Sequence, residues 1–164
     1  MSQVEWKIAP VKVAVLTVSD TRTKETDKGG KLVQEYVLQS GHDLKEAIIC
    51  KDDLLEIQKI IKAWSEEDID IIITTGGTGI AQRDVTIEAV QPLCNKVIPG
   101  FGELFRYLSY AEDIGVRAMA SRAMAGTLEN KLIYTIPGST GAIRLGMEKL
   151  ILPEMLHLLQ EIRK

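Results

Sequence analysis

The amino-acid sequence predicts an α/β fold, a three-layer α/β/α arrangement around a mostly parallel central sheet with a late antiparallel hairpin. Short runs of β-branched and other apolar residues alternate with segments whose apolar residues recur at helical spacing. Strands that alternate with helices form parallel sheets covered on both faces, and this explains why the strand segments are apolar almost throughout. Near the C-terminus, two apolar runs are separated only by Glu129-Asn130, a spacing typical of a hairpin.

The first strand is expected over residues 12–18, Lys-Val-Ala-Val-Leu-Thr-Val, where β-branched residues dominate. Polar residues 19–28 follow, and they lead into a helix over residues 29–39. Gly41 ends that helix, because glycine readily adopts the left-handed backbone of a helix C-terminus. Residues 44–50 are then expected to form the second strand.

The middle of the chain predicts an amphipathic helix, a strand and a glycine-rich loop. A strand over residues 70–75 leads into the loop Gly76-Gly77-Thr78-Gly79. A short helix then starts at Asp84 or Thr86, and Pro92 helps to end it. The amphipathic helix that precedes the strand has apolar residues at helical spacing, namely Leu54, Ile57, Ile60, Ile61 and Trp64.

The last third of the chain predicts two helices, the hairpin and a helical tail. Residues 101–111 carry apolar side chains on one helical face, and a second helix is expected over residues 115–122. The hairpin strands are expected at residues 125–128 and 131–136. The tail that follows is broken or restarted near Pro153.

Length and composition are typical of one globular domain. The chain has 164 residues, of which 45% are hydrophobic and 26% charged, and we expect a single domain with residues 1–10 as a loosely ordered extension. A net charge of −3 argues against nucleic-acid and membrane partners, because both attract basic proteins. The chain starts without a secretory signal pattern and has no apolar run of membrane-spanning length, so a cytoplasmic location is expected.

The two cysteines, Cys50 and Cys94, both have apolar neighbours. This context favours two small buried thiols, and a disulfide between them stays open as an alternative. The two histidines, His42 and His157, lie away from the expected strand ends, so neither a zinc cluster nor a histidine-based triad is expected.

Three loops that leave strands carry unusual polar chemistry. They are Ser19-Asp20-Thr21-Arg22, residues 74–79 and residues 137–141. Because parallel sheets bind ligands at the carboxyl ends of their strands, we expect these loops to meet at one edge and to form the site.

The glycine-rich loop at residues 76–79 is suited to binding an anion. Glycines allow positive φ angles and expose backbone N–H groups, and the Thr75 and Thr78 hydroxyls add donors. The loop lacks the lysine of a P-loop, and Gln82 stands where a dinucleotide fingerprint needs glycine. A purely structural turn remains the alternative for the loop taken alone.

Asp84 follows this loop by five residues. A carboxylate beside an anion-binding loop is electrostatically unfavourable unless a cation lies between them, and Mg²⁺ prefers one or two carboxylates plus phosphate oxygens. Asp52, after the second strand, is the candidate second carboxylate, although Asp53 could exchange roles with it. Each aspartate could instead be a helix N-cap.

The helix expected over residues 101–111 places Glu103, Arg106 and Ser109 three residues apart on one stripe. A solvated face with one Glu103–Arg106 ion pair is the simpler interpretation. Met119 and Met124 are expected to fill the core or a subunit interface.

Taken together, these motifs resemble the MoaB/MogA molybdopterin-binding family in order and spacing. The resemblance extends from Val13 to the helical tail, and residues 101–126 look most like the MoaB branch. Val116 and Ala120 stand where many relatives carry proline and leucine, which concerns the fit of the substrate. The motifs are Thr74-Thr75-Gly76-Gly77-Thr78-Gly79, Arg83-Asp84-Val85-Thr86, Gly100-Phe101-Gly102-Glu103 with Arg106 and Ser109, Ser121-Arg122, and Pro137-Gly138-Ser139.

The resemblance implies a trimer or a dimer of trimers that adenylylates molybdopterin with ATP and Mg²⁺ and releases pyrophosphate. It implies catalytic and metal-binding roles for Asp52 and Asp84, and other molybdenum-cofactor enzymes as further partners. A non-catalytic molybdopterin carrier or assembly protein is the alternative. The resemblance and the converging loops together place the following residues around the substrates: Ser19, Asp20, Thr75, Gly76, Gly77, Thr78, Gly79, Glu103, Arg106, Ser109, Ser121, Arg122, Pro137, Gly138 and Ser139.

Overall fold

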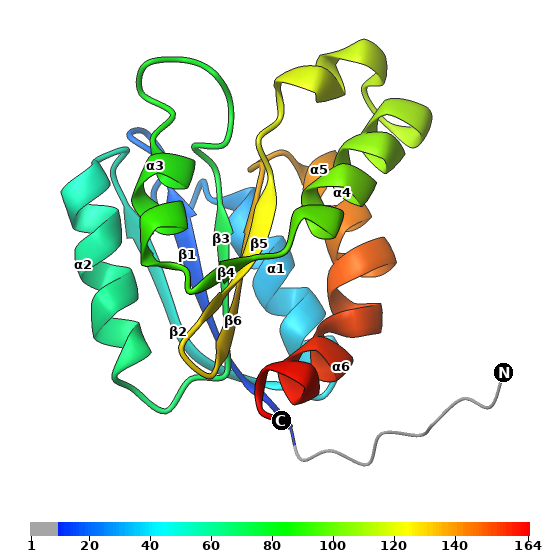
Figure 1. The fold of residues 1–164 in the computed structure, drawn as a ribbon. Coiled ribbons are helices and arrows are strands. Elements are labelled where there is room, and N and C mark those ends of the chain that lie inside the picture. The colour runs from blue at the N-terminus through cyan, green and yellow to red at the C-terminus, as the bar shows by residue number, and fades with distance from the viewer. Residues whose placement is uncertain (1–9) are drawn as a thin grey trace, which may run out of the picture.

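The structure, a computed structural model, describes residues 10–164 and contains a six-stranded sheet in the order β2-β1-β3-β6-β5-β4 (Figure 1). Strands β1, β2, β3 and β6 are parallel, β5 runs antiparallel to β6, and β4 runs antiparallel to β5. The prediction of a mostly parallel sheet with a late hairpin is therefore confirmed. The strands are β1 (Lys12–Val18), β2 (Asp43–Cys50), β3 (Ile71–Thr75), β4 (Lys96–Val97), β5 (Met124–Leu128) and β6 (Lys131–Ile136).

Helices cover both faces of the sheet and complete the three layers that the sequence predicts. Helices α2 and α3 pack on one face, and α1, α4, α5 and α6 pack on the other (Figure 1). The α-helices are α1 (Lys28–Gln39), α2 (Leu54–Ser65), α3 (Thr86–Val90), α4 (Pro99–Glu112), α5 (Thr140–Gly146) and α6 (Leu152–Ile162).

Strand β1 shows why the strand segments are apolar throughout. Val13 and Val15 face the helix layer of α1 and α5, whereas Ala14 and Leu16 face the layer of α2. All four are buried. Successive side chains of β1 point to opposite faces of the sheet, and because helices cover both faces, neither face of the strand is polar. Each large side chain buried in this way contributes roughly 1.5–3 kcal/mol.

The connections reverse direction at β1 and β3. From β1 the chain passes through α1 to β2 on one side, and then returns through α2 to β3 on the other side of β1. The loops after β1 and β3 therefore leave the sheet in opposite directions. In open α/β sheets the crevice at such a switch point is where ligands bind.

Several boundaries differ from the sequence prediction. Helix α4 begins at Pro99, two residues early, because proline suits the first helical turn. Residues Gly115–Ala120 form a 3₁₀ helix in place of an α-helix, and Met147–Ile151 form a π-helical turn before Pro153 in the first turn of α6. The short edge strand β4 was not predicted, since two residues carry no periodicity.

Cys50 is buried, Cys94 is half-buried, and both thiols are free, so the disulfide alternative is wrong. The loosely ordered extension expected for residues 1–10 lies outside the described residues, apart from Pro10. Within residues 10–164, no helix has the length and apolar character needed to cross a membrane.

Candidate functional site

A cleft of about 320 Å³ lies at the carboxyl ends of β1 and β3. All three loops expected to converge contribute to its lining, together with both expected aspartates. The structure thus brings these segments together at the switch point of the sheet. The cleft residues are Thr17, Val18, Ser19, Asp20, Thr21, Arg22, Asp52, Thr75, Gly76, Gly77, Arg83, Asp84, Gly138 and Ser139.

The glycine loop is held in a shape that only glycine allows. Gly76 and Gly77 have φ angles of +91° and +71°. A Cβ atom on Gly76 would lie 2.3 Å from the Val18 carbonyl oxygen, and one on Gly77 would lie 2.1 Å from Thr86 Oγ1. Thr86 Oγ1 also donates a hydrogen bond to the Gly76 carbonyl at 2.9 Å. The loop is therefore packed tightly against its surroundings.

Thr75, in the cleft wall, carries an unpaired buried hydroxyl. Its side chain is buried, and its Oγ1 atom has no hydrogen-bond partner within residues 10–164. A buried hydroxyl left unpaired costs about 1–3 kcal/mol, so a ligand oxygen would stabilise it. Thr78 is also buried, but together with Gly79 and Pro137 it lies outside the lining of the cleft.

The neighbouring aspartates after β2 have different surroundings. Asp53 caps α2, where its Oδ1 accepts a hydrogen bond from Glu56 N at 2.9 Å. Asp52 instead lines the cleft, and its backbone N–H donates to Asp20 Oδ1 at 2.9 Å. The geometry favours Asp52 as the cleft carboxylate.

Asp84 is not the N-cap of α3. That position belongs to Val85, and Asp84 Oδ2 accepts from Ala81 N at 3.0 Å inside its own loop. Burial raises the pKa of the Asp52 carboxyl above its ordinary value, and the charges of Asp20 and Asp84 raise it further. Negative charge is therefore concentrated at this end of the cleft.

The donor set is suited to a cation that arrives with an anionic ligand. Within residues 10–164, no group of three or more His, Cys, Asp or Glu side chains is placed to hold a metal ion. Asp52 and Asp84 remain as two carboxylates on the cleft wall, beside the glycine loop. Mg²⁺ commonly uses one or two carboxylates and completes its shell with phosphate oxygens and water.

The first and third loops are joined across the cleft by Arg22. Its Nη1 donates to the Gly138 carbonyl at 3.3 Å, and its backbone N–H donates to Ser19 Oγ at 3.1 Å. Ser139 starts α5, with its Oγ accepting from Ala142 N at 3.2 Å. Ser19 and Ser139 thus shape the loops around the cleft.

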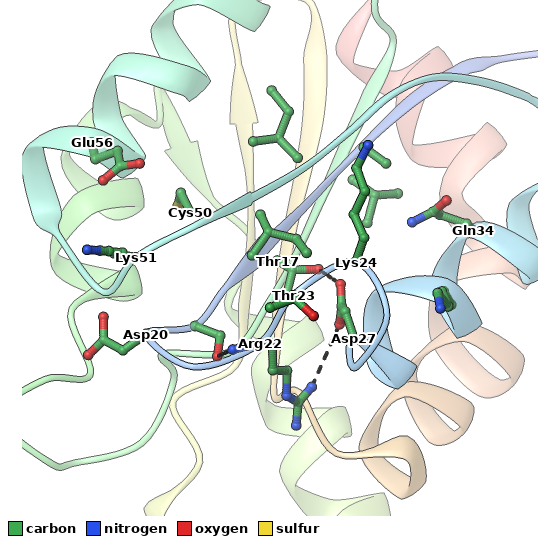
Figure 2. A pocket seen from close by; sticks show the side chains of 16 residues that line it. Thr17, Asp20, Arg22, Thr23, Lys24, Asp27, Gln34, Cys50, Lys51 and Glu56 are labelled. Atoms are coloured by element: carbon green, nitrogen blue, oxygen red, sulfur yellow. Dashed lines mark hydrogen bonds and ion pairs between the residues drawn. The ribbon is translucent and has the colours of Figure 1, made fainter.

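A larger groove of about 1010 Å³ adjoins the cleft and shares Thr17, Ser19, Asp20 and Arg22 with it (Figure 2). Lys24, Lys31 and Lys51 line it from the loop, α1 and the end of β2. Its floor is partly apolar, from Val15, Ala47, Ile48 and Ile49. The groove joins an apolar surface to a cationic one.

Asp27 is a buried carboxylate of the groove that sequence reasoning missed. Its Oδ2 accepts from Thr17 Oγ1 at 2.6 Å, and its Oδ1 accepts from Gly30 N at 2.9 Å. Arg22 Nη1 lies 3.9 Å from Oδ1, and Figure 2 shows Asp27 connected to both Thr17 and Arg22. An aspartate followed by Lys28-Gly29-Gly30 was the available signal, since it marks a helix N-cap beside a close approach.

A separate pocket of about 500 Å³ lies between α4 and the segment at residues 121–124. Glu103, Arg106, Ser121 and Arg122 all line it. Ser121 Oγ is buried without a partner within the described chain. The structure thus groups four predicted residues here, apart from the aspartates.

The alternative of a simple Glu103–Arg106 ion pair is wrong. Arg106 Nη1 donates instead to the carbonyls of Ser121, at 3.4 Å, and Ala123, at 3.0 Å. Ser109 lies on the buried face of α4 and lines neither the cleft nor the pocket. Of the stripe, Arg106 therefore binds the neighbouring segment, Ser109 is buried and Glu103 is exposed.

Comparison with known proteins gives consistent matches over nearly the whole chain. A family described as "Probable molybdopterin binding domain" matches residues 14–157. The molybdenum cofactor biosynthesis protein B of Staphylococcus aureus (strain COL) is 62% identical over 156 residues, covering 94% of this chain and 93% of that protein.

Solved structures agree with this assignment. A crystal structure of a molybdenum cofactor biosynthesis protein B matches with a TM-score of 0.91 and 51% identity, covering 94% of this chain and 97% of that one. The tungsten cofactor synthesizing protein MoaB from Pyrococcus furiosus matches with a TM-score of 0.85 and 34% identity, covering 94% and 98%.

Proposed function

The chain belongs to this family of molybdopterin-binding domains and is a molybdenum cofactor biosynthesis protein, and on this premise we propose that it is a molybdopterin adenylyltransferase. In the proposed reaction, an oxygen of the terminal phosphate of molybdopterin attacks the α-phosphorus of ATP. A new P–O bond forms, the bond between the α-phosphorus and the bridging oxygen breaks, and pyrophosphate leaves with that electron pair. The products are adenylyl-molybdopterin and pyrophosphate.

The observation that carries the proposal is an anion-binding loop placed beside two carboxylates in one cleft. Gly76 and Gly77 line the cleft with Asp52 and Asp84, and the Thr75 hydroxyl is buried there without a partner. Carboxylates would repel a phosphate unless a cation joined them. This combination favours phosphate chemistry assisted by a divalent cation over simple anion binding.

No protein base is required for this reaction. A phosphate monoester has a second pKa near 6, so at neutral pH its nucleophilic oxygen is already largely deprotonated. His42 is distant from the chemistry, since its Nδ1 accepts from Val11 N at the opposite end of β1. The main barrier is repulsion between two polyanions, which positioned charges and dipoles lower.

The residues of the cleft would divide this task. Asp52 and Asp84 would hold Mg²⁺, which would neutralise charge on the phosphates when bound. The exposed N–H groups and hydroxyls of the glycine loop would bind phosphate oxygens, and Arg22 would add positive charge from the opposite side.

The groove and the pocket suggest where the two substrates lie. The groove is continuous with the cleft through four shared residues and offers an apolar floor and lysines, which suit an adenosine and its phosphates. The pocket offers Glu103, Arg106 and the unpaired Ser121 hydroxyl beside apolar walls, which suit a polar heterocycle such as a pterin. Their phosphates would meet in the cleft.

We also propose that the chain assembles as a trimer or a dimer of trimers. Helix α4, the 3₁₀ helix that follows it and the short connection between them project from the body of the molecule (Figure 1) and expose six apolar or aromatic side chains. Exposed apolar side chains gathered in this way mark interaction surfaces. These are Leu104, Tyr107, Tyr110, Ile114, Val116 and Met119, called here the α4 patch.

The direct experiment mixes the purified protein with molybdopterin and Mg-ATP and measures adenylylated pterin by mass spectrometry. Wild type is expected to form the product and to release one pyrophosphate for each. Pterin binding by wild type without product would contradict the enzyme and favour a carrier. Nucleotide binding without pterin binding would favour a different phosphotransferase.

A further inference from the structure

Arg122 connects the pocket with the loop that carries Asp84. Its Nε donates to the Gly79 carbonyl at 2.9 Å, and its Nη2 donates to the Asp84 carbonyl at 3.1 Å. Its backbone N–H donates to the Thr78 carbonyl at 2.9 Å. Arg122 therefore donates hydrogen bonds to the loop at Thr78 and Gly79, before Asp84, and at Asp84 itself. The sequence analysis expected it to bind substrate.

The same residue is anchored on the outer side by α3. Arg122 Nη1 lies 2.5 Å from Glu88 Oε1, and the Glu88 carboxyl has a lowered pKa because of this hydrogen bond. Each nitrogen of the guanidinium group thus has an acceptor within the protein. Three of its five N–H donors are therefore used inside the protein, and these bonds hold the side chain against the loop and α3.

The loop itself is closed by internal bonds. Asp84 N donates to the Ala81 carbonyl at 3.0 Å, and Ala81 N donates to Asp84 Oδ2 at 3.0 Å. Ile80 at the tip is 76% exposed, so the tip packs weakly against the body. The position of this closed turn relative to the pocket therefore depends on Arg122.

The other end of the connection is the pocket wall. Arg106 of α4 binds the carbonyls of Ser121 and Ala123, the residues on either side of Arg122. The unpaired Ser121 hydroxyl belongs to the same wall. A ligand that bonds to Ser121 or Arg106 would restrict the backbone from which the Arg122 side chain extends.

We propose that Arg122 is a positioning residue that couples the pocket to the cleft. A pterin bound in the pocket fixes residues 121–123, and Arg122 then fixes the loop so that the Asp84 carboxylate faces the cation. This inference rests on the proposed function for the identity of the two ligands. Coupling between two binding sites is reciprocal, so the cation must also tighten binding of the pterin.

The test measures cation binding and not turnover. Mn²⁺ serves as a spectroscopic probe for Mg²⁺, and its dissociation constant is measured by electron paramagnetic resonance with and without molybdopterin. For wild type we expect molybdopterin to tighten Mn²⁺ binding at least about fivefold, a typical lower value for coupled sites. For Arg122→Gln we expect most of this tightening to be lost, leaving only what the pterin phosphate itself contributes, with molybdopterin binding retained by calorimetry.

Two further variants separate positioning from charge. Arg122→Lys keeps the positive charge but lacks the planar fork that bonds two carbonyls, so most of the coupling is expected to be lost. Glu88→Gln removes the outer ion pair and keeps the carbonyl bonds, so the ratio is expected to stay at the wild-type value. Restoration of the full ratio by lysine would overturn the positioning role.

Amide hydrogen exchange gives a second readout at the loop itself. In wild type, molybdopterin is expected to slow exchange at residues 79–84, and in Arg122→Gln it is not. The ratio compared is the Mn²⁺ dissociation constant without molybdopterin divided by that with molybdopterin. Equal ratios in wild type and Arg122→Gln would overturn the coupling. A ratio of one in wild type that binds pterin and forms product would overturn it too. Absence of pterin binding by wild type would overturn both this inference and the proposed function.

Discussion

Asp52 and Asp53 are adjacent in sequence and differ in what their carboxylates contact. Asp53 accepts a hydrogen bond from the backbone N–H of Glu56 in the first turn of α2, whereas Asp52 lines the cleft beside the glycine loop. Sequence reasoning left the two interchangeable, because either could cap α2. Their different contacts make them a matched pair for separating function from stability.

Asp52→Asn is expected to abolish adenylylation and to stabilise the fold at neutral pH. The folded-state pKa of Asp52 is raised, so its ionisation opposes folding. Its unfavourable contribution is absent below the unfolded-state pKa, grows as pH rises from that value to the folded-state pKa, and is constant above it. We expect a gain of about 0.5 kcal/mol, small because solvent screens a partly exposed carboxylate. Urea unfolding from pH 3 to pH 7 measures it, and a difference that shrinks as pH rises would contradict the sign.

Asp53→Ala is expected to lower the stability of the fold and to leave adenylylation intact. Loss of the N-cap destabilises the protein by about 1 kcal/mol, while product formation by the folded protein remains near the wild-type rate. Unfolding curves and the mass-spectrometric assay measure the two effects. Loss of turnover in Asp53→Ala with retention in Asp52→Asn would exchange the proposed roles.

Asp84→Asn is expected to abolish product formation while leaving the fold and pterin binding nearly unchanged. The asparagine carbonyl can still accept from Ala81 N, so the closed turn persists. What disappears is the negative charge that would hold Mg²⁺ beside the phosphates. The assay compares turnover, pterin affinity and thermal unfolding with wild type. Full turnover in this variant would contradict the assignment of Asp84.

At the scale of elements, the glycine loop depends on close packing as well as on backbone freedom. Gly77 and Gly41 both have positive φ, at +71° and +81°. An alanine at either position would therefore have a similarly strained backbone. A Cβ on Gly77 would collide with Thr86 Oγ1, whereas one on Gly41 would meet no atom of residues 10–164 within 4 Å. The pair therefore separates backbone strain from steric collision.

Gly41→Ala is expected to cost about 1–2 kcal/mol of stability, the usual penalty of a left-handed non-glycine residue, with turnover retained. Gly77→Ala is expected to cost more and to lose turnover, because Thr86 and the loop must move apart. Urea unfolding and the product assay compare the two variants. Equal losses in both would show that the contact with Thr86 has no role in holding the loop.

Elements with a strong period were predictable, and those held by tertiary contacts were not. The apolar run of β1 and the helical spacing from Leu54 to Trp64 identify elements wherever they pack. The two-residue strand β4 exists only because β5 offers it a partner. Asp27 was missed because nothing in the sequence links it to Thr17, which lies ten residues away in β1.

The arrangement of the candidate site was also only partly predictable. The three loops could be expected to converge, since each follows a strand of a parallel sheet. The separation of Glu103, Arg106 and Ser121 into their own pocket was not, because it depends on where α4 crosses the sheet edge. The role proposed for Arg122 likewise required its three carbonyl contacts to be seen.

At the scale of the whole molecule, the described surface is unevenly apolar. The α4 patch includes Met119, Val116 and Tyr107, which are 84%, 70% and 64% exposed. Leu55 on α2 is 74% exposed but lies on the opposite helix layer, outside the patch (Figure 1). Single exposed leucines are ordinary, whereas a group along one projecting element predicts burial by a second copy of the chain.

Tyr107→Glu with Val116→Glu is therefore expected to shift the protein from a trimer or hexamer toward monomer. Charged groups forced into an apolar contact would remain desolvated and unpaired, and central aromatic residues often contribute 2 kcal/mol or more, roughly a thirtyfold change in affinity. Sedimentation velocity at micromolar concentration measures the assembly, and Leu55→Glu is the control, with the wild-type distribution expected. A double variant that sediments as wild type would show that the subunit contact lies elsewhere.

A monomer that still binds molybdopterin would show that the pocket is complete within one chain, since Glu103 and Arg106 on the same helix line it without help from a second copy.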